Sequence, residues 1–370
     1  MKNILLKGFF GHNNLGDDLL LSEALKKYPK DVNLYIGWPR EATEELKYYQ
    51  TMRPFTPVYG RKDLIRRRYD AVVWAGGGLF PSRTFGFKQL FQMLPYRILS
   101  KRMILNGVGV VPKPNRKYFD RFLRLIDFCS VRDDKSLEFV SKSIPAMNCG
   151  DLYWGADAIG GGGKSDKTSK KYLVCLANPF SDTELQDQNV ARRFDKLVKQ
   201  CAELILRYRN EGYTIHYLPF YRGSDEKFIQ RVQQVLGTDD KVLQFGKDFS
   251  LDTINELFQQ YGFGLCMRFH SILLSVKNAL PIVAIEYDFK SEMLLSEAGL
   301  SQFGTRYGIR KSEFFGELVD IPDDALLKID AMVRTEKDVF VEKAKVFAMK
   351  CHNKVLNNYQ QIFKLIGLLS

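Results

Sequence analysis

The fold is decided by the stretch Phe263-Gly264-Leu265-Cys266-Met267-Arg268-Phe269-His270. This apolar run leads into an amphipathic segment, residues 271–280, and then into a second apolar run, residues 281–285. The pattern predicts a strand, a sharp turn, a helix and another strand. Arg268 and His270 are therefore expected between a strand's carboxyl end and a helix's amino end, where open α/β sheets bind ligands and helices attract anions. An arginine and an imidazole there suit an anionic substrate that gains or loses a proton; a purely structural histidine is the alternative.

Composition and charge narrow the class of protein. The chain has 370 residues, 45% of them hydrophobic, which predicts two α/β cores rather than one. No apolar run reaches membrane-spanning length, and the first residues are expected to form a strand rather than a signal peptide. The net charge of +12 favours polyanions, anionic lipid surfaces or phosphorylated substrates. No nucleic-acid-binding motif supports a nucleic-acid partner. No Cys-x-x-Cys spacing supports a disulfide framework or a zinc site, so we expect a cytoplasmic protein without a metal.

Strand and helix patterns alternate along the chain, which predicts an α/β fold of two Rossmann-like lobes facing a central cleft, as in two-lobed (GT-B-like) glycosyltransferases. Strands are expected at residues 4–8, 32–36, 71–75, 102–108 and 129–132, and again at 172–177, 213–218, 241–244, 262–267 and 281–285. Helices are expected at residues 17–27, 40–48, 87–101, 115–128, 190–210, 251–261 and 337–366, with Pro95 kinking or breaking the third. The expected boundaries are an amino-terminal lobe at 1–159, a glycine- and lysine-rich linker at 160–171, a second lobe at 172–336 and a carboxyl-terminal helix at 337–370 that packs back on the first lobe.

The first strand is followed by a glycine-rich loop, residues 8–18. It has neither the Gly-x-Gly-x-x-Gly spacing of a dinucleotide site nor the Gly-Lys-Ser/Thr of a phosphate-binding Walker loop. Asn14 and Gly16 are the better candidates for ligand contact, while Asp17 has the alternative role of capping the next helix.

Three further strand ends carry candidate binding residues. Gly76, Gly77 and Gly78 follow the strand at 71–75, and their backbone amides are expected to be open to a ligand. The segment 106–112 repeats this pattern at the next strand end. Arg132 ends a short strand, where it can bind a carboxylate or phosphate through two parallel hydrogen bonds. Asp133 or Asp134 is expected to cap the following helix, and a structural Arg–Asp pair is the alternative.

Taken in order, these motifs resemble those of the polysaccharide pyruvyl transferase family. The matching segments are residues 8–18, 76–78, 107–112, 130–136, 156–158, 268–270 and 285–290. One departure is Asn106-Gly107-Val108, where many members carry Gly-Gln-Gly, which affects the acceptor-side contacts. The resemblance implies transfer of a pyruvyl group from phosphoenolpyruvate to two sugar hydroxyls as a cyclic ketal, in surface or exopolysaccharide biosynthesis. It also implies a saccharide acceptor, lipid-linked or polymeric, and no nucleotide cofactor.

This chemistry assigns roles to the candidate residues. Protonation of the enol carbon needs a general acid, and His270 is the candidate. The donor's carboxylate and phosphate require cations, for which Arg132, Arg268 and Lys290 are the candidates, with Arg268 also stabilising the departing phosphate. The residues expected to position acceptor or phosphate are Asn14, Gly16, Asp17, Gly76, Gly77, Gly78 and Asp157. The base that acts on the acceptor hydroxyls is not assigned.

A basic and aromatic stretch of the first lobe suggests a membrane contact. Its apolar residues are Phe85, Phe87, Leu90, Phe91, Met93, Leu94, Tyr96, Ile98 and Leu99. Together with Arg97, Lys101 and Arg102 they predict peripheral docking on the inner face of an anionic membrane. The alternative is that the apolar residues face the core and the charges face solvent. The last helix also offers a surface for pairing subunits.

Two other functions stay open at this point. A nucleotide-sugar-dependent glycosyltransferase has the same two-lobed architecture, but the sequence shows no clear site for a base and a ribose. A non-catalytic protein that binds anionic glycans is the second alternative, and a titratable His270 beside Arg268 argues mildly against it.

Overall fold

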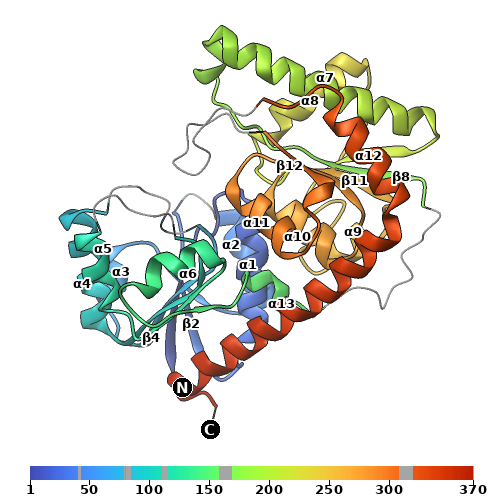
Figure 1. Ribbon diagram of the computed structural model, residues 1–370. Coiled ribbons are helices and arrows are strands. Elements are labelled where there is room, and N and C mark those ends of the chain that lie inside the picture. The colour runs from blue at the N-terminus through green and yellow to red at the C-terminus, as the bar shows by residue number, and fades with distance from the viewer. Residues whose placement is uncertain are drawn as a thin grey trace. The chain divides into compact units, whose positions relative to one another are not determined.

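The computed structural model describes residues 1–40, 43–78, 80, 85–110, 116–157, 169–307 and 320–369. The chain divides into two compact units (Figure 1). Unit 1 consists of Met1–Ala156 together with Lys350–Ser370, and unit 2 of Asp157–Met349. Most of the expected linker, residues 160–168, lies outside the described residues, as do Ala158 and residues 111–112 of the sequence motifs.

Unit 1 is built on a parallel sheet of seven strands in the order β3-β2-β1-β4-β5-β6-β7. The strands are β1 Asn3–Lys7, β2 Asn33–Gly37, β3 Thr56–Val58, β4 Tyr69–Ala75, β5 Ser100–Val108, β6 Phe128–Val131 and β7 Met147–Asn148. The five strands expected in this half are confirmed; β3 and β7 were not expected. The strand order reverses between β1 and β4, and in such sheets ligands bind outside the carboxyl ends of the strands at this point.

The helices of unit 1 connect these parallel strands. They are α1 Leu15–Lys27, α2 Thr43–Met52, α3 Arg61–Leu64, α4 Phe87–Leu99, α5 Lys117–Leu123 and α6 Asp134–Ser141, with a 3-10 turn at Leu152–Gly155. Pro95 was expected to kink or break the helix at 87–101; the break is wrong, because α4 continues through Pro95 to Leu99. Pro95 removes one hydrogen-bond donor from the helix, and the remaining turns are held by packing on the sheet. The helix expected at 115–128 ends earlier, at Leu123.

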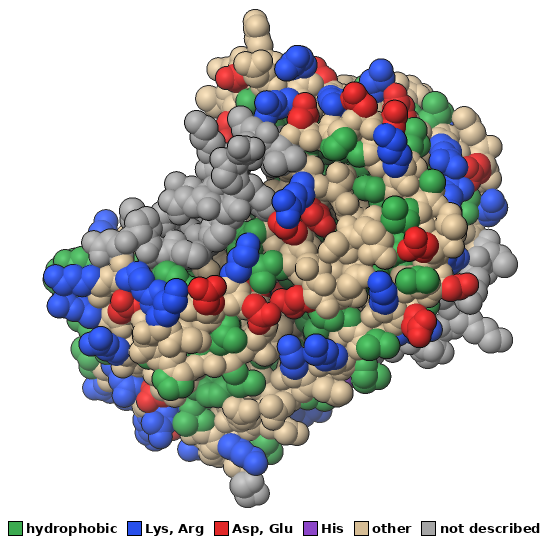
Figure 2. Space-filling view, in the orientation of Figure 1, with side chains coloured by type: hydrophobic (Ala, Val, Ile, Leu, Met, Phe, Trp, Pro, Cys, Tyr) green, Lys and Arg blue, Asp and Glu red, His purple; other side chains and the backbone are tan. Residues whose placement is uncertain are grey.

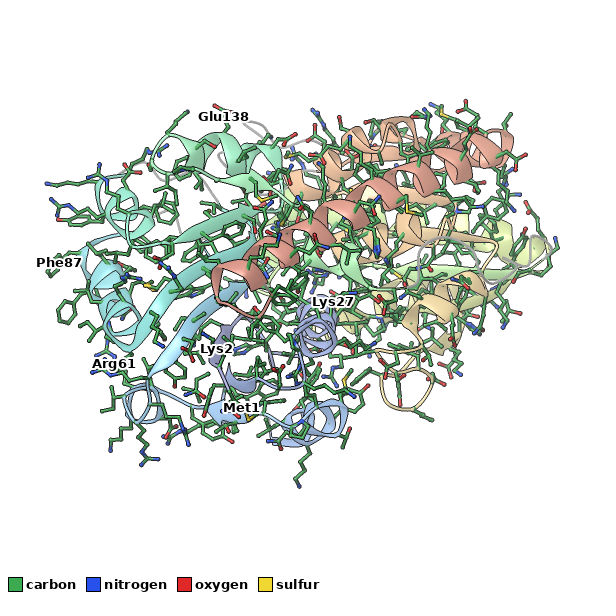
Figure 3. The ribbon with its side chains drawn as sticks, turned by 90° about the horizontal axis from the view of Figure 1, so that it is seen from below. Met1, Lys2, Lys27, Arg61, Phe87 and Glu138 are labelled. Carbon is green, nitrogen blue, oxygen red and sulfur yellow. The ribbon has the colours of Figure 1, made fainter. Side chains whose placement is uncertain are left out.

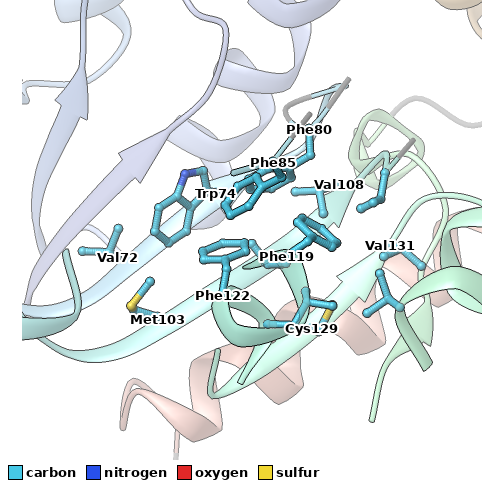
Figure 4. Close-up of a cluster of buried hydrophobic side chains, with 14 of the residues drawn as sticks. Val72, Trp74, Phe80, Phe85, Met103, Val108, Phe119, Phe122, Cys129 and Val131 are labelled. Atoms are coloured by element: carbon cyan, nitrogen blue, oxygen red, sulfur yellow. The ribbon is translucent and has the colours of Figure 1, made fainter. Parts of the chain in front are cut away.

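An aromatic core covers one face of this sheet (Figure 4). Trp74 points from β4 toward Phe122 of α5, with ring centroids 6.1 Å apart, and Phe85 lies 5.2 Å from Phe119. All four side chains are less than 8% exposed. Burying each such ring contributes about 1.5–3 kcal/mol, so this cluster fixes α5 and the strand ends beside it.

Unit 2 contains a second parallel sheet, of six strands in the order β10-β9-β8-β11-β12-β13. Its strands are β8 Lys171–Cys175, β9 Thr214–Tyr217, β10 Lys241–Val242, β11 Phe263–Cys266, β12 Ile282–Glu286 and β13 Gly304–Arg306. Its helices are α7 Gln188–Asn210, α8 Asp225–Leu236, α9 Ile254–Gln259, α10 Phe269–Lys277, α11 Phe289–Glu297, α12 Ala325–Thr335 and α13 Lys337–Leu365, with 3-10 turns at Glu184–Gln186 and Ser301–Phe303. From Lys350 onward α13 belongs to unit 1.

The strand–turn–helix–strand prediction for residues 263–285 is confirmed by β11, α10 and β12. β11 lies between β8 and β12, with Cys266 in register with Cys175 and Ala284. All three residues are fully buried, which explains why these strands are continuous apolar runs. The shared register brings the carboxyl ends of β8, β11 and β12 to one edge of the sheet.

Candidate active site

In unit 2, Arg268 lies between β11 and α10. It is the amino-terminal cap of α10, with extended backbone (φ −68°, ψ 138°), and its carbonyl accepts hydrogen bonds from the amides of Ser271 and Ile272. Extended backbone at a cap turns the chain out of the strand and into the helix. The Arg268 side chain is therefore presented at the carboxyl edge of the sheet, as the sequence predicts.

A buried carboxylate, Asp225, holds the Arg268 guanidinium. Arg268 Nε donates to Asp225 Oδ2 at 3.1 Å, and Nη2 donates to Oδ1 at 2.5 Å. Asp225 is the first residue of α8 and is fully buried. Its oxygens also accept the backbone amides of Asn178 at 3.2 Å, Phe220 at 3.1 Å and Tyr221 at 2.8 Å. One carboxylate thus ties together the ends of β8, β9 and β11, which are adjacent in the sheet.

Two tyrosines complete the surroundings of Arg268. Nη1 donates to Tyr287 Oη at 3.1 Å, and Tyr287 follows β12, the next strand of the sheet. The guanidinium carbon also lies 5.7 Å from the centre of the Tyr221 ring. Burial alone would lower the pKa of Arg268, but Tyr287 and Asp225 together raise it above its usual value. Burial raises the pKa of Tyr287 to about 12, so its hydroxyl is neutral at physiological pH.

His270 lies in the first turn of α10, two residues after Arg268. Its ring is half-buried and packs edge-on against Phe269, with ring centroids 5.2 Å apart. Lys290, in the first turn of α11, lies after β12, with its Nζ 3.5 Å from Asp288 Oδ2. Asp288 caps α11 by accepting the amides of Lys290 and Ser291. The structure therefore places Arg268, His270 and Lys290 at strand–helix junctions on the carboxyl side of the sheet of unit 2.

In unit 1, the loop after β1 is organised by Asn14 rather than by Asp17. Asn14 is the amino-terminal cap of α1, and its Oδ1 accepts the amide of Gly16 at 3.1 Å. The expectation that Asp17 caps this helix is wrong, because α1 begins at Leu15 and places Asp17 inside its first turn. Asp17 is buried instead against the turn after β4: a Cβ added to Gly77 would come within 2.8 Å of its Oδ1.

The glycine turn after β4 has a left-handed backbone, with φ of 67° at Gly76 and 71° at Gly77. Other residues adopt this conformation only with strain. The amide of Gly76 donates to the carbonyl of Asn106 at 2.7 Å. The expectation of an open amide is therefore wrong at Gly76, because its N–H extends the pairing of β4 with β5.

Arg132 follows β6 and lies against the backbone of the neighbouring strand end. A Cβ added to Gly109 would lie 2.6–2.8 Å from three atoms of the Arg132 guanidinium, and one added to Gly78 would lie 3.8 Å away. Only glycine therefore leaves room for Arg132 in this position. The side chain is buried, and its Nε lies 3.6 Å from Asp133 Oδ2. Asp133 caps α6 by accepting the amide of Ser136, which confirms one of the two expected caps.

In unit 1 the predicted site residues and the groups they contact lie at the ends of the adjacent strands β1, β4, β5 and β6. In unit 2, Arg268, His270 and Lys290 follow β11 and β12, and the segments after β8 and β9 supply the amides that bind Asp225. Asp157 is an exposed residue at the start of unit 2, where the described segment ends. Sequence reasoning missed Asp225 and Tyr221 as parts of these sites, whereas Tyr287 and Gly109 lie within the predicted motifs 285–290 and 106–112 but had no role assigned to them. A carboxylate just after a glycine turn, Gly223-Ser224-Asp225, is the only local signal that Asp225 offers.

Solved structures show the same fold at very low sequence identity. The S. aureus MnaA–UDP complex has a TM-score of 0.59 at 11% identity, covering 100% of this chain and 98% of that one. The Neisseria meningitidis UDP-GlcNAc 2-epimerase bound to UDP-GlcNAc has a TM-score of 0.56 at 11% sequence identity. Anabaena HepE in complex with UDP and glucose has a TM-score of 0.52 at 13% sequence identity. Each of these two matches covers 100% of this chain and 100% of the other chain. These are folds of the GT-B type, with two parallel sheets. They show the fold class of this chain and leave its activity open.

The sequence comparisons are more specific. No curated protein matches the sequence significantly. The family model for polysaccharide pyruvyl transferase matches residues 14–289. This match includes Asn14, the glycine turns, Arg132, Asp225 and the Arg268–His270 segment, and extends over about three-quarters of the chain. The chain therefore belongs to the polysaccharide pyruvyl transferase family.

Proposed function

We propose that the protein transfers the pyruvyl group of phosphoenolpyruvate to two hydroxyls of a saccharide, forming a cyclic ketal and releasing phosphate. The observation that carries the proposal is the junction of β11 and α10, where Arg268 is held by Asp225 and Tyr287 and is followed two residues later by His270. Family membership supports pyruvyl transfer in general.

Arg268 is shaped to bind one anionic group of this donor. Within the described part of the chain, Asp225 accepts from the Nε and Nη2 side of the guanidinium, and Tyr287 accepts one N–H of Nη1. A guanidinium has five N–H groups, so one N–H on each terminal nitrogen is left for a carboxylate or phosphate. N–H groups on both terminal nitrogens can donate to the oxygens of such an anion. The first amides of α10 add positive potential at the same place.

His270 supplies the proton that the donor requires. Protonation of the methylene carbon of phosphoenolpyruvate makes a methyl group and leaves the adjacent carbon electron-poor. One acceptor hydroxyl adds there, the bond to the phosphate oxygen breaks, and the second hydroxyl closes the ketal. The two hydroxyl protons balance the reaction: one replaces the proton given by His270 and the other leaves with phosphate. An imidazole is suited to both giving and regaining this proton near neutral pH.

The other candidate residues have supporting roles in the proposal. Lys290 and, in unit 1, Arg132 are the further cations that we assign to the donor's anionic groups. Asn14, Gly16, Asp17, the turn at Gly76–Gly78 and Asp157 are assigned to positioning of acceptor or phosphate. The reaction needs no nucleotide and no metal in this scheme, and the protein is assigned to the cytoplasm, where phosphoenolpyruvate is available.

The test is a phosphate-release assay with phosphoenolpyruvate and a panel of simple glycosides. The wild type should release phosphate only when an acceptor is present, and His270→Ala should lose at least a hundredfold in kcat, as expected for removal of a general acid. His216→Gln is the matched control, because His216 lies on β9, where its ring is hydrogen-bonded to the Tyr261 hydroxyl. This variant should keep the wild-type rate.

Ligand-induced thermal stabilisation distinguishes the remaining alternatives. Phosphoenolpyruvate should stabilise both the wild type and His270→Ala, whereas UDP-sugars should stabilise neither. Stabilisation by UDP-sugars alone, with no phosphate released from phosphoenolpyruvate, would favour a nucleotide-sugar glycosyltransferase and refute the proposal. Full activity in His270→Ala would refute the role given to His270.

A further inference from the structure

Helix α4 has two apolar faces, and within the described part of unit 1 one of them packs on the core while the other is exposed. Leu90, Met93, Tyr96 and Leu99 pack against the hydrophobic core of unit 1. A second set of apolar side chains, Phe87, Phe91, Leu94 and Ile98, is 65%, 57%, 37% and 69% exposed. Their spacing of four, three and four residues places them on one side of the helix. We refer to Phe87, Phe91, Leu94 and Ile98 as the α4 apolar face.

Exposure of this face is unusual for a helix of a globular unit. The rings of Phe87 and Phe91 are stacked, with centroids 6.3 Å apart, and Phe87 also meets Tyr118 of α5 edge-on. The rings thus form a contiguous aromatic surface rather than isolated exposed residues, and contiguous apolar surface indicates an interaction site. The alternative that the whole stretch faces the core is wrong for these four residues and correct for the other set.

Positive charge is concentrated around this face. Unit 1 carries 29 Lys and Arg against 15 Asp and Glu, while unit 2 carries 26 against 28. The entire excess positive charge of the chain therefore belongs to unit 1. Residues 61–142, which include α3, α4 and α5, hold 18 basic and 7 acidic residues. The exposed basic residues on or beside these helices are Arg61, Lys62, Arg66, Arg67, Arg68, Lys88, Lys101, Arg102, Lys117, Arg121 and Arg124.

The basic residues are attached to the same surface as the apolar face. Arg68 Nη1 donates to the carbonyl of Ile98 at 2.6 Å, which joins the arginine run after α3 to the end of α4. Figure 2 shows hydrophobic side chains among Lys and Arg side chains over α4 and α5, and in Figure 3 Phe87 and Arg61 lie at the same edge of unit 1. Nearby acids are neutralised, since Asp70 pairs with Lys101 and Asp127 with Arg97 and Arg102.

We propose that the α4 apolar face docks unit 1 on an anionic lipid surface. Aromatic and aliphatic side chains enter the boundary between headgroups and acyl chains, while a rim of Lys and Arg binds the lipid phosphates. The charge argues against a second copy of the chain on this face, because two basic rims would repel each other. Among the described residues no helix is both long and apolar enough to cross a bilayer. The proposal concerns surface binding and does not depend on the proposed reaction.

The experiment is vesicle co-flotation of the full-length protein. Vesicles of phosphatidylcholine alone are compared with vesicles that also contain roughly 30 mol% phosphatidylglycerol, to represent an anionic leaflet. The wild type should bind the anionic vesicles, with binding weakened by salt, and should not bind the neutral ones. The double variant Phe87→Ser/Phe91→Ser should bind at least tenfold more weakly, as should the triple variant Lys88→Gln/Arg121→Gln/Arg124→Gln.

A matched control is available on unit 2. Val346 and Met349 of α13 are 68% and 51% exposed, and Val346→Ser/Met349→Ser should bind vesicles like the wild type. All altered residues are exposed, so each variant should keep the wild-type thermal unfolding midpoint. Phosphate release with a soluble glycoside should also be unchanged in every variant, which separates failure of this proposal from failure of the proposed reaction.

Several results would overturn the docking proposal. These are no binding to anionic vesicles at low salt, equal binding to neutral vesicles, or undiminished binding by Phe87→Ser/Phe91→Ser. A dimer in solution that the same double variant dissociates would instead identify the α4 apolar face as an interface between two copies.

Discussion

The buried carboxylate of Asp225 offers the sharpest test of how the unit 2 site is built. Asp225→Asn keeps the shape of the side chain but replaces one oxygen acceptor with an NH2 donor. In the wild type, Asp225 Oδ1 accepts hydrogen bonds from the amide of Asn178 and from Arg268 Nη2, and Oδ2 accepts hydrogen bonds from the amides of Phe220 and Tyr221. Either orientation of the new amide therefore places its NH2 group against at least two donors, and Arg268 loses its counter-ion.

The expected cost follows from the burial of this pair. Removing one partner of a buried ion pair costs about 3–5 kcal/mol. The Arg268 side chain is 21% exposed, so water recovers part of its solvation and the lower value, about 3 kcal/mol, applies. For a unit of this size that corresponds to a fall in the thermal unfolding midpoint of roughly 6–12 °C. The affinity for phosphoenolpyruvate should fall as well, because Arg268 loses the contact that orients it.

Asp330→Asn is the matched control for this change. Asp330 is also fully buried in unit 2, where it accepts from Tyr208 Oη at 2.6 Å and from Arg334 Nε at 2.8 Å. Both variants should lose stability, but only Asp225→Asn should weaken phosphoenolpyruvate binding and speed hydrogen exchange at the amides of Asn178, Phe220 and Tyr221. The reasoning is refuted if Asp225→Asn melts with the wild type and these three amides exchange as slowly as before.

Two further outcomes follow from the local geometry. Gly109→Ala should displace the buried guanidinium of Arg132, at a cost of about 1–3 kcal/mol of stability. It should also weaken phosphoenolpyruvate binding on the order of tenfold, the loss of one hydrogen bond to a charged group. Gly60→Ala, with open space around it, is the control, and equal affinities in titrations of the two variants would contradict the assignment of Arg132. The second outcome concerns Glu286, whose pKa is raised from 4.5 to about 7 by burial, with a smaller contribution from Glu292. Between these two values the folded protein keeps a proton that the unfolded chain releases. The free energy of unfolding therefore falls as the pH rises across this interval. Glu286→Gln should remove about 2–3 kcal/mol of that pH dependence, measured as the change in the free energy of urea unfolding from about pH 5 to about pH 8. Parallel curves for the two proteins would show that Glu286 does not titrate as described.

The sheets and their ligand-side edges could be predicted because their signals are local. A buried parallel strand is a continuous apolar run, and glycines or polar residues mark its end, as at Ala75-Gly76 and Met267-Arg268. The patterns of β3, β7 and β13, which have two or three residues each, are too short to be distinguished from loops, although the equally short β10 lies within the strand predicted at 241–244. The helix predicted at 17–27 begins earlier in the structure, at Leu15. Asn14 and Asp17 are both residue types that cap helices, so the sequence did not show which of them precedes the first turn.

The partners within each site could not be predicted, because topology rather than spacing brings them together. Asp225 and Arg268 are 43 positions apart and meet because β9, β8 and β11 are neighbours in the sheet although they are not consecutive in that order. From the sequence alone, an aspartate at the start of a helix is explained by the helix dipole. The contact of Gly109 with Arg132 likewise depends on the pairing of β5 with β6.

The arrangement around Arg268 also explains why the proposed role suits an arginine and would not suit a lysine. The charge of Arg268 is already balanced by Asp225, so net charge would contribute little to the anion binding that we propose at this position. What remains is geometry: one planar group donates to Asp225 through Nε and Nη2 and to Tyr287 through Nη1, and still has an N–H on each terminal nitrogen. A lysine ammonium is a point charge with three rotatable donors and cannot hold the planar arrangement that satisfies both partners and leaves two N–H groups. Since Asp225 and Tyr287 fix the plane of the guanidinium before any ligand arrives, the entropic cost of orienting it is met during folding rather than during binding.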